Sequence, residues 1–127
     1  MKRLFIVVLT VLFLFGVSYA GEVTVDIGGE FKFVWEANTE SDVIGYRIYL
    51  STTAGEYVYG AGNEYTSVGV MTNPESGPHS IGTEGIYYFV VTAFDAGGHE
   101  SEPSEEQTAY VVDMPPGAPQ GCQVLEF

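Results

Sequence analysis

The sequence predicts an all-β domain, a seven-stranded antiparallel β-sandwich of Greek-key type, from three observations. Downstream of residue 20 the apolar residues alternate with a period of two and never form a 3.6-residue stripe. Gly and Pro divide this region into short runs, with turn signals at regular spacing. Aromatic residues reach 14%, and the β-branched residues that strands favour recur throughout. A chain of 127 residues is long enough for one such domain.

The first 20 residues have the layout of a secretory signal peptide. Residues 1–3 carry two basic side chains, and an almost unbroken apolar run extends from residue 4 to residue 17. Ser18 and Ala20 then place small residues at the two positions that a signal peptidase reads. A membrane-spanning helix needs about 20 apolar residues, and this run is shorter. We therefore expect cleavage after Ala20 and a secreted, extracellular or periplasmic protein; an uncleaved N-terminal anchor is the alternative.

The charge is strongly acidic, at −13 for the whole chain. Removal of Lys2 and Arg3 would make it −15, since Lys32 and Arg47 alone would then oppose 17 acidic residues. Such a field repels nucleic acid and anionic membrane surfaces, which are excluded as partners after cleavage. Solubility is the simplest role of the acidic surface, and a basic partner or divalent cations are the alternative.

The predicted strands begin directly after the leader. Residues 22–27 form the first and residues 30–36 the second, and the Gly28-Gly29 pair between them predicts a hairpin turn. In the second strand the inward positions are Phe31, Phe33 and Trp35. Firm strand signals follow at residues 45–50, 86–94 and 108–112, and weaker ones at residues 57–59, 65–71 and 79–81; seven strands are expected in total. Residues 72–78 are expected to be a loop, because two prolines there disfavour a central strand.

Two blocks of sequence resemble fibronectin type III domains, which have an immunoglobulin-like fold. FVWEANTESDVIGYRIYLST is similar to the B strand, BC loop and C strand of that family. IGTEGIYYFVVTAFDAGGHESEPS is similar to the E–F corner, F strand and FG loop of bacterial members. The resemblance covers residues 22–113 and implies these fold-defining core positions: Trp35, Tyr46, Ile81, Tyr87, Val91 and Ala93. It also implies that the Tyr87 hydroxyl bonds a backbone carbonyl just upstream. Gly85 departs from the family, in which Thr is frequent at this position.

The predicted organisation is therefore a signal peptide at 1–20, a fibronectin type III-like domain at 21–113 and a Pro/Gly-rich segment at 114–127. Pro115, Pro116 and Pro119 resemble the linker that opens a following domain of the family. The last segment is either the stub of a tandem array or a tail that docks on the sandwich or on a partner, and we favour a tail.

No convergent set of catalytic groups is visible, so we expect no enzyme and no cofactor. His79 and His99 lie in expected loops without metal-ligand spacing, and both are predicted to be exposed. Asp95, Glu100 and Glu102 supply oxygen atoms for calcium, but their spacing is not that of a calcium loop. No metal site is therefore predicted.

The candidate binding face is the outer side of the sheet that pairs residues 45–50 with residues 86–94. Alternation places these side chains there: Arg47, Tyr49, Tyr88, Val90 and Thr92. Exposed tyrosines can anchor a protein or stack on a sugar ring, whereas cross-strand pairing would only stabilise the sheet. The expected function is a secreted or cell-surface module for protein interaction or spacing. The alternatives are a carbohydrate-binding module and a structural subunit, the latter linked through the tail or Cys122.

Overall fold

The computed structural model describes residues 6–11, 13–14, 17–18 and 21–127, with side chains from residue 21 onward. These residues form ten strands and no helix, which confirms the all-β part of the predicted fold class. The sheets are not purely antiparallel, because two of their strand pairs are parallel. Among them, no helix is long and apolar enough to cross a membrane. The basic residues at positions 1–3 and the expected cleavage junction at Ala20 lie outside the described residues.

The larger sheet has five strands in the order β4-β10-β9-β6-β7. Their bounds are β4 (Glu22–Asp26), β10 (Gln107–Val112), β9 (Gly85–Asp95), β6 (Val43–Ser51) and β7 (Thr66–Gly69). The β10–β9, β9–β6 and β6–β7 pairs are antiparallel, whereas β4 runs parallel to β10. The strands nearest the two ends of the 21–112 region are therefore neighbours at one edge of this sheet.

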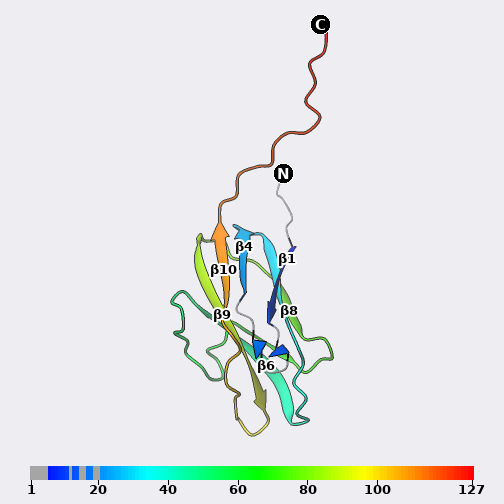
Figure 1. Cartoon of the computed structure of the whole chain (residues 1–127). Helices are drawn as coiled ribbons and strands as arrows, with labels where there is room; N and C mark the ends of the chain where they lie inside the picture. Colours follow the sequence, from blue (N-terminus) through cyan, green and yellow to red (C-terminus); the bar gives the residue numbers. More distant parts are fainter. Residues whose placement is uncertain (1–5, 12, 15–16, 19–20) are drawn as a thin grey trace.

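The second sheet has the order β1-β5-β8, with β1 (Ile6–Val11), β5 (Glu30–Trp35) and β8 (Glu75–His79). β1 pairs in parallel with the whole of β5, whereas β8 pairs with β5 in antiparallel fashion. Two short strands, β2 (Phe13–Leu14) and β3 (Val17–Ser18), pair with each other. Figure 1 shows β1 and β8 beside the larger sheet, and the C-terminal segment leading away from the end at which β10 stops.

Side chains from both sheets meet in one core. β5 contributes Phe31, Phe33 and Trp35, and their alternation matches the prediction. The strands of the facing sheet contribute Tyr46, Ile48, Phe89, Val91 and Ala93. The rings of Phe33 and Phe89 lie 4.7 Å apart and join the two layers. This burial removes a large apolar surface from water and is the main source of stability in a domain without a disulfide among its described residues.

The predicted core positions are confirmed. Trp35, Tyr46, Val91 and Ala93 are buried, and Ile81 and Tyr87 are partly buried against them. The Tyr87 hydroxyl donates a 2.9 Å hydrogen bond to the carbonyl oxygen of Thr83, four residues upstream. This bond links Tyr87 of β9 to the turn that precedes the strand, and it is the kind of bond that the family resemblance implied.

Three local predictions are wrong. β4 and β5 do not form a hairpin, because β4 pairs with β10 and the turn at Gly28-Gly29 carries the chain from one sheet to the other. Residues 57–59 form no strand. β8 begins at Glu75, within the segment predicted to be a loop, and it tolerates Pro78 because it is an edge strand.

Candidate functional site

The face that the sequence predicted as a binding surface is assembled but covered. Arg47 lies opposite Thr92 and Tyr49 lies opposite Val90 in the β6–β9 register. However, Tyr49, Val90 and Thr92 are only 1%, 3% and 2% exposed, and Tyr88 is half-buried. The expectation of an open tyrosine patch is therefore corrected. Alternation predicts the side of a strand on which a residue lies, but it does not predict which loops pack over that side.

The cover is the long connection between β6 and β7, residues 52–65. The ring of Tyr59 packs edge-on against Tyr49 at 5.0 Å, and the Gly60 amide donates a 3.0 Å hydrogen bond to the Tyr49 hydroxyl. The Tyr57 hydroxyl and the Gly55 amide each donate a 2.7 Å hydrogen bond to Glu106. Burial raises the pKa of Tyr57, and the hydrogen bond to Glu106 raises it further. The connection is therefore held at two points on the outer face of the sheet.

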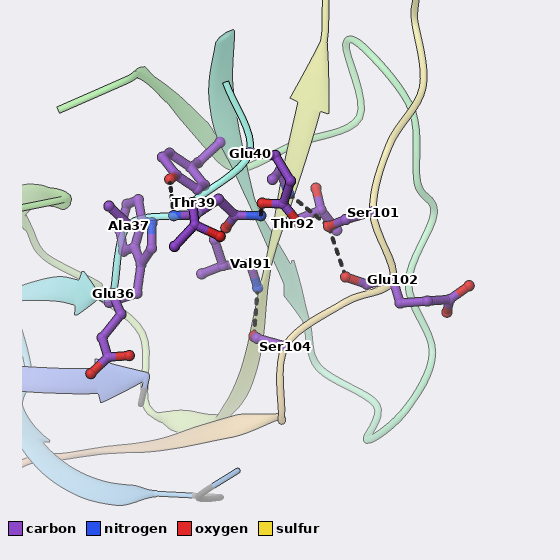
Figure 2. A pocket seen from close by; sticks show the side chains of 13 residues that line it. Glu36, Ala37, Thr39, Glu40, Val91, Thr92, Ser101, Glu102 and Ser104 are labelled. Atoms are coloured by element: carbon purple, nitrogen blue, oxygen red, sulfur yellow. Dashed lines mark hydrogen bonds between the residues drawn. The ribbon is translucent and has the colours of Figure 1, made fainter. Parts of the chain in front are cut away.

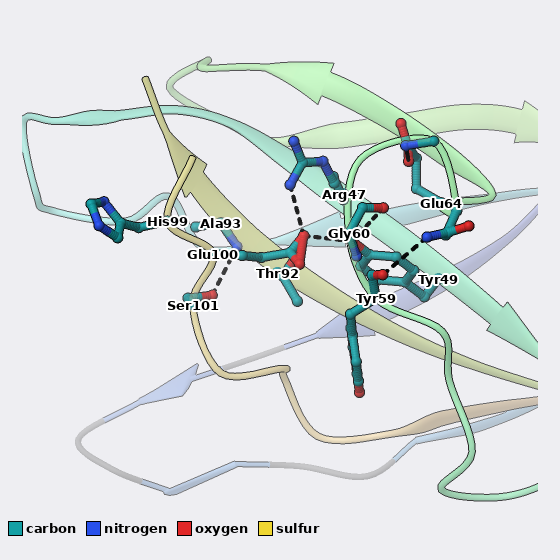
Figure 3. Close-up of polar contacts among 12 residues, drawn as sticks. Arg47, Tyr49, Tyr59, Gly60, Glu64, Thr92, Ala93, His99, Glu100 and Ser101 are labelled. Carbon is teal, nitrogen blue, oxygen red and sulfur yellow. Dashed lines mark hydrogen bonds and ion pairs between the residues drawn. The ribbon is translucent and has the colours of Figure 1, made fainter. Parts of the chain in front are cut away.

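Glu100 lies at the centre of the polar contacts beneath this cover (Figure 3). One of its carboxylate oxygens accepts hydrogen bonds from Arg47 at 2.9 Å, from Tyr49 at 2.5 Å and from Thr92 at 3.0 Å. Burial opposes ionisation of Glu100, but these three bonds outweigh it and hold the pKa below its usual value. The Arg47 guanidinium also lies 3.9 Å from the centre of the Phe94 ring. The three bonds join β6, β9 and the loop after β9 at one carboxylate oxygen, and we call this network the lock.

The three carboxylates considered for calcium do not converge. Glu100 belongs to the lock, and Asp95 accepts a 3.1 Å hydrogen bond from the exposed ring of His99. Glu102 lies in a different place, along the cavity described next. Within the described part of the chain, no group of three or more His, Cys, Asp or Glu residues is arranged to hold a metal ion.

A cavity of about 430 Å³ opens between residues 36–40 and residues 101–104 (Figure 2). Its lining includes Trp35 at the end of β5, Tyr46 of β6, and Val91 and Ala93 of β9. The indole of Trp35 meets the Tyr46 ring edge-on, with 5.2 Å between the ring centres. Trp35 is 8% exposed, and its Nε1 atom has no hydrogen-bond partner in the described structure. The apolar part of the lining therefore combines two aromatic side chains with Val91 and Ala93.

Both walls of the cavity are fixed by hydrogen bonds. On one side, the Asn38 amide donates a 2.8 Å bond to the Tyr46 hydroxyl. On the other, the hydroxyls of Ser101 and Ser104 accept the amide hydrogens of Ala93 and Val91, each at 2.9 Å. The amides of the same two serines donate 2.8 Å bonds to the carbonyls of Ala93 and Val91. Residues 101–104 form no strand, but these four bonds hold them beside β9 and fix that wall of the cavity.

The charged groups that line the cavity are all acidic. Figure 2 shows Glu36 and Glu102 on opposite sides of it, with Glu40 between them. Glu40 also accepts a 3.1 Å hydrogen bond from the Asn38 side chain. None of the described lining residues is basic. An aromatic floor beside carboxylates suits an organic cation, which aromatic faces and carboxylates both attract.

Sequence reasoning identified Trp35 and Tyr46 as core residues and missed that they line this cavity. The available signal was the position of Glu36 and Glu40 directly after a strand that ends in a tryptophan. Glu102 was considered only for calcium, because its approach to residues 36–40 depends on how two distant loops meet at one end of the sandwich.

These observations define the class of protein as an all-β domain of two packed sheets with an acidic, aromatic-lined cavity at one end. The chain matches no family model, no curated protein and no solved structure.

Proposed function

We propose that this chain is an exported, non-catalytic binding module with a fibronectin type III-type sandwich, and that its cavity takes an arginine side chain of a protein partner. Export is inferred from the basic start, the apolar run and the small residues at 18 and 20. The binding proposal rests on one observation, the combination of Trp35 and Tyr46 with three lining carboxylates.

Three features support the fibronectin type III assignment. Trp35 and Tyr46, which the resemblance makes core residues of neighbouring strands in the sequence, pack together across the two sheets. Tyr87 makes its bond to Thr83 at the corner before β9. β5 and β8 pair with each other and face a sheet that contains β10, β9, β6 and β7. The parallel pairing of β4 with β10 is an additional feature of this chain.

Arginine fits the cavity better than lysine does. A planar guanidinium is weakly hydrated and donates paired hydrogen bonds to carboxylates, whereas an ammonium group is a compact and strongly hydrated charge. Glu36, Glu40 and Glu102 line the cavity and make its surroundings negatively charged. The net charge, −15 after removal of residues 1–20, attracts a basic partner and increases its rate of association.

The carbohydrate alternative loses the surface on which it depended. It required Tyr49 and Tyr88 to form an open stacking platform, and Tyr49 is 1% exposed beneath residues 52–65. Neither a spacer nor a structural subunit needs a cavity, so ligand binding through the cavity distinguishes the binding module from both of these alternatives.

The fluorescence of Trp35 tests the proposal directly, because this is the single tryptophan of the chain. We expect a tetra-arginine peptide to change the intensity or the emission maximum in a saturable way. Tetra-lysine should bind more weakly, and tetra-citrulline, which has the shape of arginine without its charge, should not bind.

The triple variant Glu36→Gln, Glu40→Gln, Glu102→Gln should weaken arginine binding by about tenfold or more. The matched control is Glu30→Gln, Glu56→Gln, Asp113→Asn, which removes the same charge from residues that do not line the cavity. Equal weakening by both triples would mean diffuse attraction by the whole surface. That result, or the absence of any Trp35 response, would refute the cavity as the site.

A further inference from the structure

We propose that export opens the outer edge of β5, and that residues 121–127 of a second copy of this chain add to that edge as a strand. The inference rests on the export half of the proposed function, because it requires removal of residues 1–20. It is independent of arginine binding in the cavity.

The edge is occupied in the full chain by β1. Ile6 lies opposite Glu30 and Val11 lies opposite Trp35, so β1 pairs with β5 along its whole length. β1 also falls inside the apolar run that marks the leader. Cleavage after Ala20 would leave this sheet with β5 and β8 alone. The free backbone groups of β5 would then form a template for another strand.

The strand that follows in the sequence does not fill the gap. β4 begins two residues after the expected cleavage point, but it belongs to the other sheet and pairs with β10. In the described structure, β4 therefore closes the edge of the five-stranded sheet and leaves the β5 edge to β1. The exported domain would therefore lack the strand that pairs with the outer edge of β5 in the full chain.

The chain carries a segment of suitable length and chemistry to replace it. β5 has six residues, and residues 121–127 read GCQVLEF. Val124, Leu125 and Phe127 are exposed large hydrophobic residues, which is costly for a solvated segment. Addition of an extended segment to a free sheet edge gives backbone hydrogen bonds and buries alternate side chains. An apolar strand already accepted at this edge, β1, shows that the edge tolerates such an occupant.

The direction of the segment favours a second copy over the same chain. The Asp113 amide donates a 3.1 Å hydrogen bond to Glu84, and the Met114 amide donates a 3.0 Å bond to Asp26. These bonds fix the exit from β10, and the segment then leads away from its own sandwich (Figure 1). Pro115, Pro116 and Pro119 stiffen the spacer before the donor residues. A segment of one copy seated on the edge of the next is a head-to-tail contact, which builds open chains of molecules unless a ring closes.

The effect of salt concentration distinguishes self-association through residues 121–127 from arginine binding in the cavity. Each exported copy would carry a charge of −15, with Lys32 and Arg47 against 17 acidic residues, so copies repel one another. Added salt screens that repulsion and should strengthen self-association. The same salt should weaken the capture of arginine peptides, because that contact joins opposite charges.

The test uses the whole 127-residue chain, expressed with its own leader in an exporting host and purified in a reducing agent, so that Cys122 forms no disulfide. Mass spectrometry defines the N-terminus. Sedimentation velocity over a wide range of concentration then measures association. The wild type should form head-to-tail oligomers, and Val124→Asp with Leu125→Asp should shift the midpoint of association about tenfold or more to higher concentration. Val58→Asp, at a 73% exposed position in the 52–65 connection, is the control and should associate like the wild type.

A peptide of residues 121–127 should dissociate the wild-type oligomers by occupying the free edges, and a scrambled peptide should not. An N-terminus at Met1 in the exported protein overturns the proposal and the export that it assumes. A processed protein that stays monomeric overturns the strand addition alone, and arginine binding detected by Trp35 fluorescence in the same sample would leave the cavity intact. Protection of amides 121–127 from hydrogen exchange in a monomer would show that the segment docks on its own chain, which also rejects the second copy.

Discussion

Tyr49 and Glu100, which lie 51 positions apart in the sequence, are joined by a 2.5 Å hydrogen bond beneath the connection that follows β6. The Tyr49 hydroxyl also accepts the Gly60 amide, so one side chain ties that connection to the loop after β9. The outer face of the β6–β9 pair, which the sequence predicted as an exposed binding surface, is thus covered and held by side-chain hydrogen bonds.

Removal of the central acceptor should destabilise the domain. Glu100→Ala leaves the Arg47 guanidinium, whose side chain is 14% exposed, without its partner, and it frees the hydroxyls of Tyr49 and Thr92. We expect the free energy of unfolding to fall by about 2–3 kcal/mol, since breaking a buried ion pair from one side costs more than the pair is worth. Urea denaturation measures it, with Glu102→Ala as a control expected to stay within about 0.5 kcal/mol. Equal losses in the two variants would contradict the role of Glu100 as the lock.

Two glycines that face each other in the β6–β7 ladder should respond differently to alanine. A Cβ atom on Gly45 would lie 2.7 Å from the Phe94 ring and 2.8 Å from the Val68 carbonyl oxygen, whereas one on Gly69 meets nothing within 4 Å. Gly45→Ala should therefore cost about 1–3 kcal/mol through overpacking. Gly69→Ala should be neutral or slightly stabilising, because alanine loses less backbone entropy on folding. Thermal unfolding of both variants checks this, and a stable Gly45→Ala would show that Phe94 and its Arg47 contact can move.

The corner before β9 should depend on one hydroxyl. Tyr87→Phe removes the bond to the Thr83 carbonyl and keeps the ring, so the expected loss is about 0.5–1 kcal/mol. Tyr88→Phe removes a hydroxyl from the next residue, on the opposite face of the strand, and serves as the comparison. If the two variants lose the same stability, the Thr83 bond has no special part in fixing the corner.

Stability should fall as the pH drops below about 6.5, the ordinary pKa of histidine. Burial lowers the pKa of His79, whose ring contacts Phe31 and Phe33. The folded state therefore binds its proton less readily than the unfolded state does, and stability rises with pH through this window and is complete above it. Denaturation at a series of pH values should show this slope in the wild type and lose it in His79→Phe. The exposed His99 is the control, and His99→Gln should keep the slope.

The alternation of residues was enough to predict the core but not its surroundings. Phe31, Phe33 and Trp35 face inward because a strand buried on one side must place its apolar residues at every second position. The same rule placed Tyr49 and Thr92 on the outer face correctly. It gave no information on the 52–65 connection, whose position depends on a few polar contacts made by residues that are distant in sequence.

The pairing of strands was less predictable than their existence. The Gly28-Gly29 turn signalled a chain reversal, but a turn of this kind is compatible with passage to the opposite sheet, and β4 gains its partner from the far end of the domain. His79 was expected in an exposed loop. It is half-buried in β8, because edge pairing with β5 brings it over the aromatic core. The cavity has the same origin, since Glu40 and Glu102 become neighbours only after the two sheets have packed.

The parallel ladder of β4 and β10 has a mechanical consequence. From Glu22 opposite Thr108 to Asp26 opposite Val112, the two strands run in the same direction. A force that pulls residue 21 away from residue 113 therefore shears the two strands past each other. Because the hydrogen bonds of a parallel pair are evenly spaced, this force loads all of them at the same time. Bonds strained in parallel must break nearly at once, whereas the bonds of a hairpin pulled apart at its open end break one after another. Tension along the chain thus meets its greatest resistance at the first strand of the domain.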